Sequence, residues 1–220
     1  TRNERHFRRN QIARYVLIMS GALPAPLQNL VGKLAKLPGL GPKSAMRIAI
    51  TLLKWPEAET RRFGEDIASL RDTLRLCSRC GALSATDPCR ICADANRDQT
   101  VLCVIPEWDS MLALEEAGFY NGYYFVLGGL LAPLEKSGTS SIDLPGLNAR
   151  LAEGKIEEII LALGSTIEGE NTATYISQAV RGKFPSIRVS RLAQGMPLGS
   201  EVKYMDKETL RQSWKYRQQI

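Results

Sequence analysis

Hydrophobic residues in the front of the chain recur at helical spacing. From Pro26 onward the period of three and four residues predicts an amphipathic helix that stops at Pro38. A second helix is expected from Lys43 to about Leu53, and residues 57–76 have the same period. The positions that carry these three repeats are Leu27, Leu30, Val31, Leu34, Leu37, then Ala45, Ile48, Ala49, Leu52, then Ile67, Leu70 and Leu74. The front third is therefore expected to be helical.

The pattern changes after residue 100 to short apolar runs that alternate with helical stretches. The expected strands are 101–105, 123–127, 156–163 and 187–191, and the expected helices are 111–117 and 172–180. Such alternation favours a parallel sheet with helices on both faces, whose ligand sites lie at the carboxyl ends of the strands. The sequence thus predicts an α plus α/β protein.

Between these two regions lie two Cys-x-x-Cys pairs. Cys77 and Cys80 form the first pair, and Cys89 and Cys92 form the second after eight intervening residues. Four thiolates at this spacing can surround one tetrahedral ion, and Zn²⁺ is the natural occupant. The alternative is a pair of disulfides or four buried thiols. Because four thiolates leave no open coordination position, the zinc is expected to be structural.

Charge is distributed unevenly along the 220 residues, whose formal net charge is +6. Residues 1–18 hold five Arg and one Glu, residues 21–76 hold nine basic and five acidic residues, and residues 77–220 hold fifteen and seventeen. This asymmetry indicates a front that binds polyanions. Residues 1–20 are expected to be a disordered basic extension rather than a dedicated DNA-binding arm.

Other features of the sequence exclude several function classes. The only histidine, His6, lies in the basic extension, which argues against Ser-His-Asp and His-Glu-x-x-His chemistry. No apolar run is long enough to span a membrane and no secretory signal is apparent, so the expected location is cytoplasmic. Cys103, in an apolar run, is most simply a small buried hydrophobic residue.

The turn between the first two helices reads Pro38-Gly39-Leu40-Gly41-Pro42. Helix, Gly-rich turn, helix is the pattern of the helix-hairpin-helix DNA-binding motif. Gly39 and Gly41 would let backbone N–H groups approach a phosphate at the start of the second helix. Lys43 and Arg47, one turn apart, could reach neighbouring phosphates without reading base sequence. The alternative is an ordinary helical hairpin with solvated basic residues.

Acidic residues follow two of the expected strands. Glu107 comes after the first strand, and Glu168 and Glu170 lie within the loop expected after the third. Carboxylates that converge across the sheet edge could bind Mg²⁺, with water completing its shell. Solvated loop carboxylates are at least as good an interpretation of the spacing, and the cluster could instead form an acidic surface for a basic partner.

The order of these parts resembles the RecR family of bacterial recombination mediator proteins over residues 24–215. The resemblance is carried by Pro-Gly-Leu-Gly-Pro-Lys-Ser-Ala, the four cysteines, Gly-Ser-Thr-Ile-Glu-Gly-Glu-Asn-Thr-Ala-Thr-Tyr, and Arg191-Leu-Ala-Gln-Gly-Met-Pro-Leu-Gly-Ser200. It implies a Toprim-like α/β domain and a non-enzymatic DNA-repair role. It also implies a ring-like tetramer that can encircle DNA. The implied partners are proteins of the RecO and RecF type, with which the family helps to load recombinase at single-stranded gaps.

The resemblance assigns Lys43 and Arg47 to DNA and the four cysteines to zinc. One departure concerns the first Toprim strand, which typically ends in Val-Val-Glu in the family. Here Pro106 stands at the Glu position, Glu107 follows one residue late, and Ser110 replaces a later Asp. A shift of one residue reverses the side-chain direction, which weighs against an Mg²⁺ site. The alternative function is a Mg²⁺-dependent Toprim nuclease, primase or topoisomerase-like enzyme.

These observations predict five segments. They are a basic extension (1–20), a helix-hairpin-helix region (21–76), a four-cysteine zinc finger acting as a hinge (77–92), a Toprim-like domain (99–193) and a C-terminal assembly segment (194–220).

Overall fold

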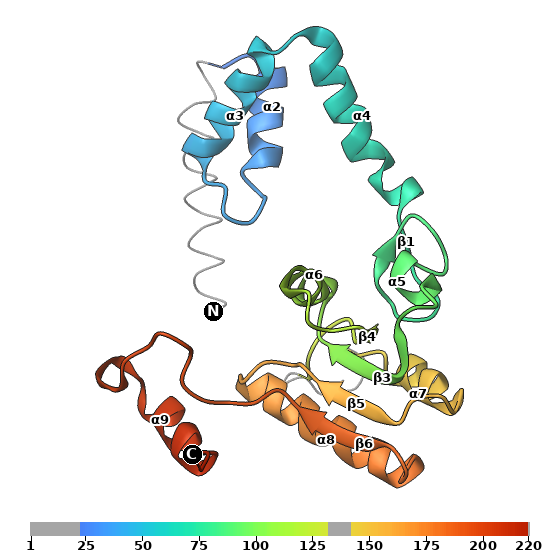
Figure 1. The fold of residues 1–220 in the computed structure, drawn as a ribbon. Helices are drawn as coiled ribbons and strands as arrows, with labels where there is room; N and C mark the ends of the chain where they lie inside the picture. The colour runs from blue at the N-terminus through green and yellow to red at the C-terminus, as the bar shows by residue number, and fades with distance from the viewer. Residues whose placement is uncertain (1–22, 132–141, 220) are drawn as a thin grey trace. The chain divides into compact units, whose positions relative to one another are not determined.

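The computed structural model describes residues 23–131 and 142–219, and the expectation for residues 1–20 lies outside these ranges. The chain divides into two compact units, residues 1–71 and 72–220 (Figure 1). Each unit has its own hydrophobic core. Within the described residues, no helix is long and apolar enough to cross a membrane.

The first unit contains the predicted helical hairpin. Helix α2 spans Ala25–Leu34 and α3 spans Pro42–Lys54. The two helices pack through small residues, because Ala45 and Ala49 are completely buried against Val31 and Ala35. Helix α2 ends three residues before the predicted Leu37. There the N–H groups of Lys36 and Leu37 bond to carbonyls three residues back, which tightens the chain into the turn.

Helix α4, Glu57–Thr73, confirms the third predicted helix except at its end. The last two residues of that prediction, Arg75–Leu76, form strand β1, which pairs with β2 (Leu83–Ser84) in an antiparallel ribbon. No residue of α4 is buried. Its side chains Phe63 and Ile67 are 43% and 56% exposed, so α4 presents apolar surface that the described residues do not cover.

The second unit is built on a four-stranded parallel sheet with the order β4-β3-β5-β6. The strands are β3 (Asp98–Ile105), β4 (Gly122–Val126), β5 (Glu158–Leu161) and β6 (Arg188–Arg191). Every residue of β4 is buried, and residues 102–105 of β3 are buried as well. Since successive side chains point to opposite faces, both faces of these strands are covered, as the alternating pattern predicted.

Helices connect the parallel strands. Helix α6 (Trp108–Ala117) follows β3, α7 (Leu144–Ala152) precedes β5, and α8 (Ile167–Lys183) joins β5 to β6. Helix α7 was not predicted, although Asp143 caps it by accepting a hydrogen bond from the Gly146 N–H. Helix α8 begins five residues before the predicted start, because Thr166 caps it by accepting from the Gly169 N–H at 3.1 Å.

Three short elements complete the chain. Helix α5 (Arg90–Ala93) lies within the four-cysteine segment. After β6 the chain forms the 3₁₀ turn η1 (Val202–Tyr204) and helix α9 (Lys207–Lys215) (Figure 1). Asp206 caps α9 through the N–H groups of Glu208 and Thr209. The C-terminal segment is therefore partly helical, a feature that was not predicted.

Candidate metal centre and nucleic-acid interface

The four cysteines converge on one point. The sulfurs of Cys77, Cys80, Cys89 and Cys92 all lie within 4.8 Å of one another, and all four residues are buried. Sulfurs bound to zinc at about 2.3 Å in a tetrahedron lie about 3.8 Å apart. The Cys80 and Cys89 sulfurs are 3.7 Å apart, close to that edge length. The donor set and its spacing therefore suit a structural zinc ion.

Hydrogen bonds and burial act in opposite directions on these thiols. The backbone N–H of Cys89 donates to the Cys77 sulfur at 3.3 Å, and that of Cys92 donates to the Cys89 sulfur at 3.4 Å. Burial nevertheless raises the pKa of Cys89 to about 11, whereas at Cys77 burial is outweighed by backbone hydrogen bonds and the pKa is lowered. Cys89 thus needs a bound cation to be a thiolate at neutral pH, and zinc binding should release its proton.

The zinc knuckle, residues 77–92, packs into the α/β unit. Its cysteines belong to the same hydrophobic core as β3 and β4, and the Val126 N–H of β4 donates to the Cys80 carbonyl at 2.8 Å. Gly81 permits this approach, because its φ is +73° and an added Cβ would lie 3.0 Å from the Val126 carbonyl. The knuckle is therefore not the hinge that the sequence suggested, and the boundary between the units falls at Arg71.

The hairpin turn leaves the start of α3 open. Gly39 has a φ of +77°, which glycine adopts without strain, and no atom of the described residues lies within 4 Å of a Cβ added at Gly39 or Gly41. No side chain caps α3, no acidic residue lies in its first turn, and Pro42 occupies its first position. The N–H groups of the first turn are then available to an anion at the positive end of the helix.

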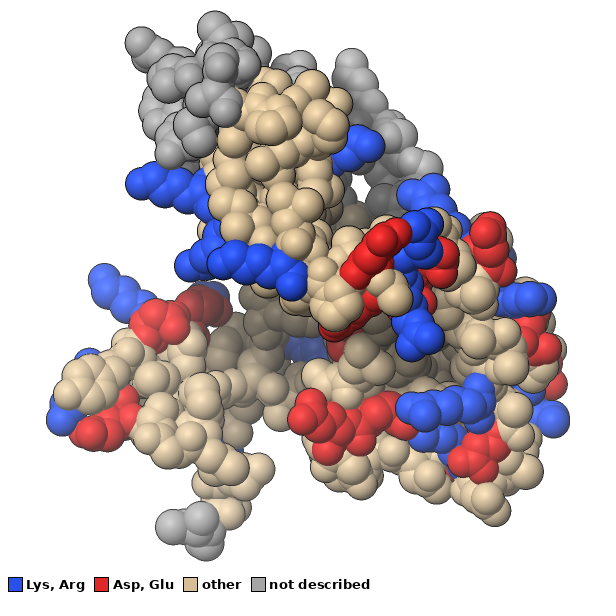
Figure 2. Space-filling model, turned by 90° about the horizontal axis from the view of Figure 1, so that it is seen from above, with Lys and Arg blue, Asp and Glu red and all other residues tan. Residues whose placement is uncertain are grey.

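Two cations lie on the exposed surface of α3 beside this open end. Lys43 and Arg47 are both exposed, and neither forms a salt bridge within the described residues. Figure 2 shows basic and acidic side chains mixed over much of the face in view, together with some basic side chains that have no acidic neighbour in this view. Lys43 and Arg47 are thus free to contact phosphates.

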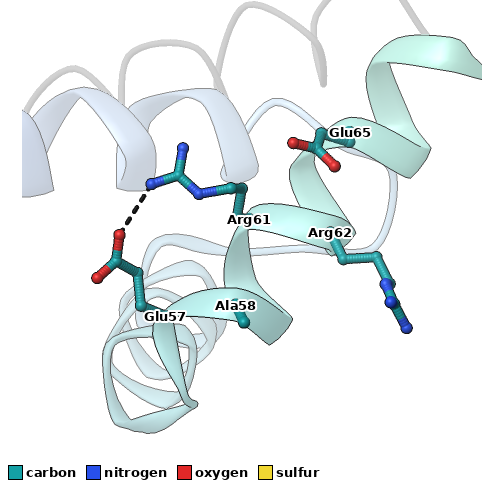
Figure 3. A pocket seen from close by; sticks show the side chains of 5 residues that line it. All are labelled: Glu57, Ala58, Arg61, Arg62 and Glu65. Atoms are coloured by element: carbon teal, nitrogen blue, oxygen red, sulfur yellow. Dashed lines mark hydrogen bonds and ion pairs between the residues drawn. The ribbon is translucent and has the colours of Figure 1, made fainter.

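A shallow hollow on α4 offers a contrast. All the residues that line it belong to this one helix: Glu57, Ala58, Arg61, Arg62 and Glu65. Arg61 donates to Glu57 at 2.8 Å, while Arg62 points away from that pair (Figure 3). Its cations and carboxylates do not converge on a common point, so the hollow is not a persuasive binding site.

The structure does not gather the three candidate carboxylates into a metal-ligand group. Within the described residues, only the four cysteines place three or more ligand atoms close enough for one ion. Glu107 is exposed directly before α6, whereas Glu168 and Glu170 lie in the first turn of α8 rather than in a loop.

Glu170 already has partners in this unit. Its carboxylate accepts from Arg191 at 2.7 Å and from the Gln194 amide at 2.6 Å. Arg191 also donates to the Tyr216 hydroxyl at 3.3 Å, so the cluster links α8, β6 and the end of α9. Sequence reasoning missed these roles. The only available signal was that Arg191 and Gln194 lie in the tail motif shared with the resembled family.

The start of α8 lies in the Gly-Ser-Thr-Ile-Glu-Gly-Glu-Asn-Thr stretch, and its packing requires small and hydroxyl-bearing residues there. A Cβ at Gly169 would lie 2.6 Å from the carbonyl oxygens of Leu163 and Gly164, so only glycine fits without movement. Thr172 is completely buried. Its hydroxyl donates to the Glu168 carbonyl at 2.6 Å and accepts from the Leu131 N–H at 2.9 Å.

Four family models match successive parts of the chain. They describe the RecR helix-hairpin-helix (residues 27–70), the RecR zinc finger domain of the four-cysteine type (74–94), the Toprim domain (100–193) and the RecR C-terminal region (195–218). These findings confirm the predicted zinc site, because the family model that covers the knuckle is a four-cysteine zinc finger and the structure brings the four cysteines together.

Relatives named "Recombination protein RecR" match most of the chain. The protein of Nitratidesulfovibrio vulgaris is 59% identical over 198 residues, and that of Maridesulfovibrio salexigens is 52% identical over 198 residues. Both alignments cover 90% of this chain and 98% of the relative. The protein of Acidothermus cellulolyticus is 40% identical over 194 residues, or 88% of this chain and 96% of the relative. The chain belongs to the RecR family of recombination proteins.

Proposed function

We propose that this protein is a DNA-binding accessory factor of recombinational repair that contacts DNA through the α2–α3 hairpin. The observation that carries the proposal is the open start of α3, where uncapped N–H groups lie on the same helix as exposed Lys43 and Arg47. Such a site binds the phosphate backbone and is indifferent to base sequence. This fits a factor that acts wherever a gap occurs.

The proposal includes assembly into a ring-like clamp, which we infer to be a homotetramer. Exposed apolar side chains of the first unit support it, because soluble proteins rarely leave such residues grouped without a partner. Among the described residues these include Ile50 and Leu53 of α3, Trp55 directly after α3, and Phe63 and Ile67 on α4. A second copy would bury them, and a closed assembly could encircle DNA.

We further propose partners of the RecO and RecF type, with which the protein helps to load recombinase at single-stranded gaps in the cytoplasm. Glu168 supports an acidic contact with a basic partner, since it is exposed and has no ion pair within the described residues. Ile167 beside it is 72% exposed and could add apolar contact. Complementary charge of this kind sets association rate and specificity.

No catalytic turnover is included in the proposal. Toprim-type phosphodiester chemistry needs carboxylates that hold a metal near the phosphate. Pro106 occupies the expected acidic position after β3, and Glu170 is engaged by Arg191 and Gln194. The Mg²⁺-dependent nuclease, primase or topoisomerase-like alternative would have to break these contacts.

The hairpin can be tested with the double variant Lys43→Ala, Arg47→Ala. Each lost phosphate contact should lower the slope of log K against log salt by about 0.9 on duplex DNA, so two contacts should lower it by about 1.8. The loss should be similar for all base sequences. Fluorescence anisotropy from about 50 to 200 mM salt measures the slope, a range over which it is readily resolved.

The matched control is Lys54→Ala with Arg62→Ala, which removes the same charge from exposed positions of the same unit. This control should keep at least most of the wild-type slope. Equal losses in the two double variants would mean that only overall charge matters, and the hairpin would then not be the DNA site.

A further inference from the structure

The first Cys-x-x-Cys segment of the zinc knuckle forms a short turn with Arg79 inside it, between Cys77 and Cys80. The Cys77 N–H donates to the Ala82 carbonyl at 2.8 Å. The Gly81 N–H donates to the Cys77 carbonyl at 2.9 Å. Because the turn is short and hydrogen-bonded, a contact that holds the Arg79 side chain also restrains the two sulfurs beside it.

Helix α7 provides that contact through Glu153, the residue at its C-terminal cap. The Arg79 guanidinium donates to Glu153 Oε2 at 3.0 Å, and the Arg150 guanidinium donates to the same oxygen at 2.5 Å. The Arg150 side chain is only 5% exposed and has no other salt bridge within the described residues. Since a buried guanidinium without its carboxylate is strongly unfavourable, Arg150 holds Glu153 in place for Arg79.

Arg150 also leads to the second pair of cysteines. Its guanidinium lies 5.3 Å from the centroid of the Tyr123 ring in β4. The Tyr123 hydroxyl donates at 3.1 Å to the carbonyl of Asp94, which directly follows α5. Helix α5 contains Cys92, and Cys89 is its N-cap. Contacts that start at Arg150 therefore restrain both sulfur pairs.

We propose that Arg79, Tyr123, Arg150 and Glu153, which we name the α7 clamp, are positioning residues of the zinc site. The clamp directs the two sulfur pairs toward one point before the ion binds, and it slows release of the ion afterwards. Loss of a partner outside the ligand shell typically weakens metal binding by about 10–100-fold. Because the clamp acts through the ligand turns and not on the sulfurs themselves, we expect the lower end of this range. The clamp lies within the second unit and is independent of the proposed DNA contact.

The test measures zinc affinity and zinc release in the full-length protein, by competition with a colorimetric chelator. Glu153→Gln keeps the shape of the side chain but removes the charge that both arginines share. It should weaken zinc binding and speed zinc release about tenfold. Wild-type affinity and release in this variant would overturn the proposal.

The matched control is Glu157→Gln. Glu157 is exposed, lies in the same segment between α7 and β5, and forms no salt bridge within the described residues. This variant should keep the zinc affinity and release rate of wild type. A wild type that holds no zinc would refute the metal centre as well as the clamp.

A second comparison separates positioning from a general loss of stability. Val180→Ala removes methyl groups from a completely buried position of α8, which should destabilise the same unit without touching the clamp. The thiolate bands of the Co²⁺-substituted protein report the sulfur geometry, and they should shift in Glu153→Gln but not in Val180→Ala. If zinc release in the two variants follows only their free energy of unfolding, the α7 clamp does not position the ligands and the proposal is overturned.

Arg79 gives a graded check on the same contact. Arg79→Lys keeps a cation that can reach Glu153 and should retain most of the zinc affinity, whereas Arg79→Ala should lose part of it. The double variant Arg79→Ala, Glu153→Gln should lose no more than Glu153→Gln alone, because residues that act through one contact are not additive. Fully additive losses would show that the two residues act separately, which contradicts the clamp.

Discussion

Glu115 of α6 is the residue whose loss the structure predicts to be most damaging to the polar interior of the α/β unit. Its carboxylate accepts from Arg97 at 2.9 Å and 2.5 Å and from the Tyr124 hydroxyl at 2.8 Å. Arg97 also donates to the Gly122 carbonyl at 3.1 Å, at the start of β4. The cluster therefore joins α6 to the segments that begin β3 and β4. The perturbation is Glu115→Ala.

The magnitude follows from burial. The side chains of Arg97 and Glu115 are 12% and 22% exposed, so water can replace the lost carboxylate only in part. Removing one partner of a buried pair costs about 3–5 kcal/mol, and hydrogen bonds to charged groups contribute about 1.5–3 kcal/mol each without adding fully. For this partly exposed pair we expect the free energy of unfolding to fall by roughly 2–3 kcal/mol.

The loss should depend on pH. Burial alone would raise the pKa of Glu115, but hydrogen bonds from Arg97 and Tyr124 outweigh it and hold the pKa below its usual value. A carboxylate whose pKa is lower in the folded state stabilises the fold above its unfolded pKa of about 4.3. That contribution disappears as the pH falls through the folded pKa. The difference between wild type and Glu115→Ala should therefore shrink below about pH 4.

Urea unfolding followed by circular dichroism measures the change, and hydrogen exchange of β3 and β4 amides assigns it to the α/β unit. The matched control is Glu116→Ala, since Glu116 is exposed, adjacent and equally charged. If the two variants differ by less than about 0.5 kcal/mol at pH 7, a typical effect of surface substitutions, the cluster does not stabilise the unit and the reasoning is refuted.

Three further predictions concern zinc, a partner and catalysis. Cys80→Ser should abolish the expected content of about one zinc per chain and destabilise the protein, because a structural ion contributes its binding energy to folding. The control is Cys103→Ser, at a buried cysteine outside the cluster, which should retain zinc. Metal analysis that finds the wild-type zinc content in Cys80→Ser would contradict the site. Glu168→Ala should weaken binding to a RecO-type partner about fivefold, as expected for one surface charge pair, and leave DNA binding unchanged, whereas Glu157→Ala should affect neither. The wild-type protein should leave supercoiled DNA, single-stranded DNA and RNA intact when it is incubated with them and Mg²⁺. Cleavage of any of these substrates by wild type, if it is lost in Glu168→Ala, would favour the enzyme alternative.

The sequence by itself determined the features that depend on residues close together in the chain. Apolar periodicity located the three front helices, because a helix is specified by contacts three and four residues apart. The two Cys-x-x-Cys pairs located the metal centre for the same reason, since each short turn presents two sulfurs together. Alternating apolar strands and helices were enough to predict a parallel sheet, which the parallel pairing of neighbours in the order β4-β3-β5-β6 confirms.

The tertiary structure decided the features that join distant segments. Glu170 looked like a metal ligand in sequence, but the chain returns Arg191 and Gln194 to its carboxylate from 21 and 24 residues away. The knuckle looked like a hinge, but Val126 bonds to Cys80 and places it in the core of the α/β unit. Hydrophobic periodicity carries no information about which loops meet at a sheet edge, or about which polar groups find partners there. Those pairings arise only when packing brings the segments together.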